Sequence, residues 1–124
     1  MADSEDLTAE AIARRLDTQY KMLQRCCVML PVPINLPDMG AFQADVEAPP
    51  AVERTAEIAT EQPMPEEAQA ALFTACVFWL TGMDLLGIFA IGGWSRVRAH
   101  QILKALDISQ DALKSLGEWL LAQD

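Results

Sequence analysis

The side chains in this sequence that could carry out chemistry are few. Cys26 and Cys27 are adjacent, Cys76 is the only further cysteine, and His100 is the only histidine. Adjacent residues on a helix point about 100° apart, so Cys26 and Cys27 cannot hold one metal ion without ligands from elsewhere. The sequence also contains no glycine-rich phosphate loop and no nucleophile-elbow motif. We therefore expect no catalytic residue, no metal site and no cofactor, and we interpret the protein as non-enzymatic.

Asp84 is the only charged residue in the most apolar stretch of the chain, residues 70–94. A carboxylate in such surroundings usually has a partner. That partner would come from the basic segment that follows the stretch, which contains Arg96, Arg98 and His100. A second interpretation is a carboxylate with a raised pKa that serves proton transfer or partner switching. We include Asp84 among the candidate partner-binding residues.

The element that carries Asp84 is predicted to be a long helix over residues 65–91. Pro65 suits a first helical position, Glu66 and Glu67 favour the positive end of the helix dipole, and Gly92-Gly93 is a plausible stop. Apolar residues project from this helix on every side. Such a helix is buried either within protein or within lipid.

Both environments fit part of the sequence. For lipid, the apolar run is long enough to span a bilayer, Trp79 and Trp94 suit its interfaces, and basic residues follow. Against lipid, Asp84 near the centre would cost roughly 2.5–3.5 kcal/mol. We also find no export signal, and the three cysteines do not form a disulfide framework. We expect a cytoplasmic protein with a buried helix, and keep a single-span membrane accessory subunit with residues 70–94 in lipid as the alternative.

Residues 8–30 are predicted to form an amphipathic helix. Acidic residues crowd its start and basic residues its later part, as the helix dipole favours. Its apolar positions follow a spacing of four and three with one polar interruption, at Ile12, Leu16, Gln19, Leu23, Cys26 and Leu30. This spacing predicts a seam packed against another helix, in the same chain or in a partner.

Residues 31–64 are predicted to form a long proline-rich acidic connector. All seven prolines lie between Pro31 and Pro65 and disfavour a long helix there. Between Pro31 and Glu67 the chain has eight acids and one base, so residues 31–67 carry −7 of the total charge of −9. Its first part contains apolar residues that could wrap over the core or fill a partner's groove, namely Val32, Ile34, Leu36, Met39 and Phe42. Its second part reads as a solvated linker, with a short helix near residues 51–60 as an option.

Residues 95–122 are predicted to form a hairpin of two short helices, with Ser95 and Ser109 as their caps. The sequence ILKALDISQDALKSLGEWL resembles the helix-turn-helix pattern of bacterial DNA-binding proteins at Leu106, Ile108, Ser109, Gln110, Leu113 and Leu116. Asp107 stands where that pattern expects a turn glycine, and Leu103 where it expects a small residue. The resemblance implies a DNA-binding regulator, whereas the four bases and four acids from residue 94 onward favour a hairpin without a DNA role.

Taken together, the sequence predicts an all-α protein in a single domain, residues 1–124. About four helices would surround the apolar central helix, with the long acidic connector between them. At 52% hydrophobic content the chain can fold, and its charge of −9 disfavours nucleic acid. We expect a protein-interaction protein, such as an adaptor, subunit, assembly chaperone or inhibitor, with a protein partner or a second copy and no small-molecule substrate. An acidic mimic of nucleic acid is a further alternative. The candidate partner-binding residues are Leu16, Leu23, Leu30, Ile34, Leu36, Phe42 and Asp84.

Overall fold

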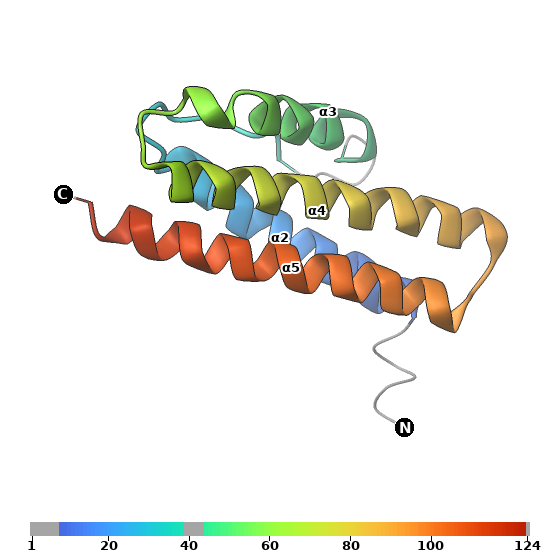
Figure 1. Ribbon diagram of the computed structural model, residues 1–124. Coiled ribbons are helices and arrows are strands. Elements are labelled where there is room, and N and C mark those ends of the chain that lie inside the picture. Colours follow the sequence, from blue (N-terminus) through green and yellow to red (C-terminus); the bar gives the residue numbers. More distant parts are fainter. Residues whose placement is uncertain (1–7, 39–43, 124) are drawn as a thin grey trace.

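The computed structural model describes residues 8–38 and 44–123, and in these residues the fold is all-helical, with four helices packed together (Figure 1). This confirms the predicted all-α bundle. The elements in chain order are α2 (Ala9–Val28), α3 (Ala44–Glu57), the short 3₁₀ helix η1 (Ala59–Glu61), α4 (Glu66–Gly92) and α5 (Arg96–Leu121). The side chains of α3 are described from Glu47 onward.

Helices α4 and α5 form a long antiparallel hairpin, and α2 packs against both of them (Figure 1). The turn between the two helices is formed by residues with suitable local preferences. Gly93 has a φ of 84°, which glycine adopts without strain, and Ser95 caps α5 by accepting a hydrogen bond from the Arg98 N–H at 3.3 Å. Helix α3 and η1 also lie against α4, on the side away from α5 (Figure 1).

Helix α2 packs its apolar seam into the core of its own chain. Thr8 caps it, with its hydroxyl oxygen accepting a hydrogen bond from the Ala11 N–H at 3.1 Å. The buried side chains follow helical spacing at Ile12, Leu16, Gln19, Tyr20, Leu23 and Cys27. Gln19, the polar interruption of the seam, donates from Nε2 to the main-chain oxygen of Leu106 at 3.0 Å. The seam therefore meets helices of the same chain.

The predicted connector over residues 31–64 contains more helix than the sequence suggested. Pro49 and Pro50 lie inside α3, at its sixth and seventh of fourteen residues, and Val52 and Ala56 after them are buried in the core. Each proline removes one helical hydrogen bond, and the burial of the side chains that follow offsets this loss. Gln62 links the two ends of the segment through hydrogen bonds to Val32. Its Oε1 accepts from the Val32 N–H at 3.0 Å, and its Nε2 donates to the Val32 oxygen at 2.8 Å.

The three long helices approach most closely near the middle of α4. At Gly82, an added Cβ would lie 3.0 Å from Cδ2 of Leu106 and 3.2 Å from Cδ2 of Leu16. Two buried polar bonds join the same region: Trp79 donates from Nε1 to the Leu16 oxygen at 3.0 Å, and Ser109 donates its hydroxyl to the Ala75 oxygen at 2.8 Å. These contacts set the register of the hairpin and of α2.

The prediction of two short helices over residues 95–122 is wrong, because α5 is one continuous helix from Arg96 to Leu121. Asp107 lies within it and forms an ion pair with Arg15. Ser109, predicted to begin a second helix, is fully buried, and its hydroxyl donates a hydrogen bond to the Ala75 oxygen of α4. Neither glycine nor proline interrupts residues 96–116, so nothing local ends the helix there. The turn that a helix-turn-helix requires is therefore missing from this segment.

Candidate functional site

Helix α4 leaves one of its sides uncovered. Its buried side chains face α2, α3 and α5, among them Leu72, Ala75, Cys76 and Trp79. On the opposite side, large apolar side chains stay in solvent: Phe73 and Ile88 are each 48% exposed, and Ile91 is 91% exposed. The helix is long and apolar enough to cross a membrane. Of its most apolar 18 residues, only a third are buried within the protein. One side of an unusually apolar helix is thus exposed to solvent.

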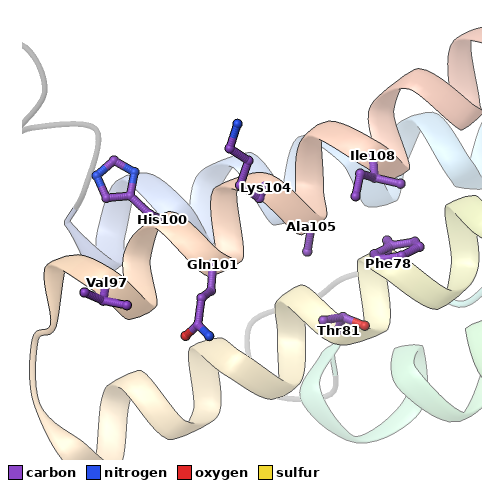
Figure 2. A pocket seen from close by; sticks show the side chains of 8 residues that line it. All are labelled: Phe78, Thr81, Val97, His100, Gln101, Lys104, Ala105 and Ile108. Carbon is purple, nitrogen blue, oxygen red and sulfur yellow. The ribbon is translucent and has the colours of Figure 1, made fainter.

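Helix α5 extends this apolar surface along its edge next to α4. Val97 is 72% exposed and Ile108 is 42% exposed. Between the helices runs a shallow groove of about 540 Å³ (Figure 2). Phe78 and Thr81 of α4 line one wall, and α5 lines the other with Val97, His100, Gln101, Lys104, Ala105 and Ile108.

We call the combined surface the outer face and define it by Phe73, Phe78, Thr81, Ile88 and Ile91 of α4 with Val97 and Ile108 of α5. Figure 2 shows His100 and Lys104 at the rim of the groove, pointing away from α4. The floor of the face is therefore apolar and its edge carries basic groups. This pattern of apolar centre and polar rim is typical of protein interfaces.

Asp84 lies on the outer face, by helical spacing three residues after Thr81 and four before Ile88. Its side chain is exposed and forms no ion pair or hydrogen bond within residues 8–38 and 44–123. The predicted contact with a basic residue after the turn is thus not made. Asp84 remains the only charge in the middle of this face.

The other predicted partner-binding residues do not form an accessible surface. Ile34 is half-buried against the core, and Phe42 lies outside the described residues. The remaining four are buried in the core of their own chain, namely Leu16, Leu23, Leu30 and Leu36. The connector residues among them lie on α2, where Tyr20 donates its hydroxyl proton to the Pro37 oxygen and Gln24 Nε2 donates to the Leu36 oxygen. Of the predicted residues that the structure describes, Asp84 is the one whose side chain is exposed to a partner.

The residues that define the outer face were not among those predicted from the sequence to bind a partner. The signal was present, because α4 is apolar all round while α2 and α5 each present only one apolar side. Two amphipathic helices cannot cover every side of a third helix. Which side stays open, however, depends on how the helices pack.

The three cysteines are free thiols, of which Cys27 and Cys76 are buried and Cys26 is half-buried. Burial raises the pKa of the Cys27 thiol to about 12 and also raises the pKa values of Cys26 and Cys76. A raised pKa removes the thiolate that nucleophilic or metal-binding chemistry needs. Among residues 8–38 and 44–123, no group of three or more His, Cys, Asp or Glu side chains is close enough to hold a metal ion.

Charge is distributed unevenly along the α4–α5 hairpin. Glu66 and Glu67 are exposed at its open end, and Arg96 and Arg98 lie at its closed end just after the turn. The ion pairs within the described ranges, Arg15 with Asp107 and Lys21 with Asp17, involve none of these four groups. The hairpin is thus acidic at one end and basic at the other.

Comparison with known proteins identifies no relative of this chain. No protein-family model matches the chain, and neither a curated protein nor a solved structure matches it. The outer face, with its apolar floor, its central carboxylate and its charged ends, is therefore the feature from which a function must be argued.

Proposed function

We propose that this protein is a non-catalytic protein-interaction module, an adaptor or subunit of a larger assembly, and that the outer face is its docking surface. The observation that carries the proposal is the exposure of large apolar side chains on one face, above all Ile91 and Val97. Fully burying one such side chain is worth roughly 1.5–3 kcal/mol. Contiguous apolar surface of this kind marks interaction sites in soluble proteins.

The packing of α5 favours a protein partner over a lipid environment. Helix α5 runs along α4 and carries Arg96, Lys104, Asp107 and Lys114 on its exposed positions. For α4 to span a bilayer, it would have to leave α5 and break the bond between Ser109 and Ala75. The continuous helix α5 likewise removes the support for a helix-turn-helix regulator.

Site-specific photo-crosslinking tests the proposal. Benzoylphenylalanine placed at Phe73 or at Ile88 should form a covalent adduct of defined mass in cells, because both side chains lie on the outer face. The matched control places the same probe at Val28, which is 51% exposed at the end of α2. Helix α2 packs on the buried side of α4, so this probe should form no adduct of the same mass.

Two results would contradict the proposal. One is the absence of any protein adduct from both face positions. The other is the same adducts from Val28 as from Ile88, which would indicate unspecific contact of exposed apolar groups. Circular dichroism of each probe-bearing protein confirms that the helical fold is retained.

A further inference from the structure

We propose that a second copy of this chain occupies the outer face, with the two α4 helices antiparallel about a two-fold axis near their midpoint. This inference rests on the proposed function, because it names the partner that the docking surface receives. Two-fold dimers use the same patch on both subunits, so the patch must complement itself. Size, charge at the ends and the place of Asp84 all meet that condition.

The outer face is large enough for a stable dimer. Helix α4 has 27 residues, so it is about 40 Å long. The side of the α4–α5 hairpin that carries the face is about 20 Å wide, since each helix with its side chains measures about 10 Å across. The resulting area is roughly 800 Å², which is what each subunit buries in an interface of standard size.

The charges at the ends of the hairpin complement each other only in the antiparallel arrangement. The two-fold rotation about the midpoint of α4 places the first turn of one α4, with Glu66 and Glu67, over the last turn of the partner's α4. Arg96 and Arg98 follow that end directly after the turn. Opposite charges therefore meet at both ends of the interface. A parallel arrangement would bring acid to acid and base to base instead.

Asp84 supports the same orientation. It lies five residues beyond the midpoint of α4, so in the antiparallel dimer the two Asp84 carboxylates are separated by about 15 Å along the axis. In a parallel dimer they would face each other across the apolar floor, where like charges are costly. The total charge of −9 on each copy repels the other, but beyond about 8 Å this repulsion is screened at physiological ionic strength.

Light-scattering mass on the purified full chain, from about 1 to 100 µM, is the first test. The wild type should have twice the chain mass of 13.6 kDa. Ile88→Glu should convert it to a monomer with unchanged helicity, because it removes an apolar contact and places a second carboxylate one helical turn from Asp84. Val28→Glu is the matched control, since Val28 is equally exposed but lies on α2. This control should remain a dimer.

Charge exchange tests the orientation and does not depend on the apolar contacts. The double reversal Glu66→Arg with Glu67→Arg should weaken the dimer about tenfold, and Arg96→Glu with Arg98→Glu should do the same. The chain that carries all four changes should dimerise within about twofold of the wild type. Such rescue is expected only if the two ends meet between copies.

Several outcomes would overturn the inference. A wild-type monomer throughout the range does so, and if Ile88 still crosslinks to a different protein, the proposed function survives while the second copy is excluded. A dimer that Ile88→Glu leaves intact excludes this face as the interface. A monomer that binds vesicles of phosphatidylcholine through the face overturns both proposals, because lipid is then the occupant. Failure of the four changes to restore dimerisation excludes the antiparallel arrangement.

Discussion

Tyr20, Cys27 and Cys76 are buried groups whose environment disfavours their charged forms. Burial, together with the nearby Cys27 and Asp38, raises the pKa of Tyr20 to about 12 from an ordinary 10.0. Burial likewise raises the pKa of Cys27 to about 12 from 9.0 and raises the pKa of Cys76. The unfolded chain would release these protons at lower pH than the folded chain does.

The expected consequence is a loss of stability at alkaline pH. The contribution of these groups is fully present below pH 9, and it decreases as pH rises from about 9 toward 12, because the unfolded state then gains from ionisation. Urea unfolding followed by circular dichroism between pH 7 and pH 11 measures this. The variant Cys76→Ala should lose stability less steeply over the same range. A free energy of unfolding that stays constant to pH 11 would contradict the assignment of these groups as buried.

Trp79 is the largest fully buried side chain, and we expect Trp79→Phe to lower the free energy of unfolding by about 1–3 kcal/mol. The change removes part of the ring that packs against Tyr20, with ring centroids 5.2 Å apart, and the hydrogen bond from Nε1 to the Leu16 oxygen. Urea titration monitored by circular dichroism at 222 nm gives the value. A change below about 0.5 kcal/mol would show that neither contact matters to stability.

At the scale of elements, substitutions at two glycines of α4 distinguish the effect of helix propensity on stability from the effect of packing between helices. Alanine favours a helix over glycine by about 0.5–1 kcal/mol. At Gly87 an added Cβ has nothing within 4 Å, whereas at Gly82 it meets Leu106 and Leu16. We expect Gly87→Ala to stabilise the protein by about 0.5–1 kcal/mol. We expect Gly82→Ala to be the less stable of the two by about 1 kcal/mol or more, because the leucine side chains must shift.

Thermal and urea unfolding of the two variants in parallel provides the comparison. Both positions lie in the same helix, so differences in helix propensity cancel between them. Equal stabilisation by both substitutions would mean that α2, α4 and α5 do not approach closely at Gly82.

For the whole molecule, self-association through the outer face would couple stability to concentration. A dimer that dissociates on unfolding gains up to about 1.4 kcal/mol per dimer for each tenfold rise in protein concentration. The urea midpoint of the wild type should therefore rise between about 1 and 100 µM. The midpoint of Ile88→Glu should not change with concentration. A wild-type midpoint independent of concentration would argue against the dimer as the folded unit.

Local chemistry in the sequence determined the helical class and the ends of several helices. Pro65 and Gly92-Gly93 bracket the long apolar helix, and Thr8 begins α2 within the predicted range. Such signals act within one or two turns, so they can be recognised without knowing the fold. The same local rules failed at residues 106–110. There, a cap-like Ser109 is used for a buried bond to another helix instead.

Only the tertiary structure decided which apolar surfaces cover one another. The seam of α2 could have served a partner, and the structure instead packs Leu16 and Leu23 into their own core. The sequence showed that α4 is apolar on every side, yet only the placement of α2, α3 and α5 leaves Phe73 and Ile88 in solvent. The physical reason is that hydrophobic burial is non-directional. The periodicity of apolar residues therefore shows that a surface must be covered, but it does not show which segment covers it. The outer face, and with it the candidate site, exists only once the distant segments have packed.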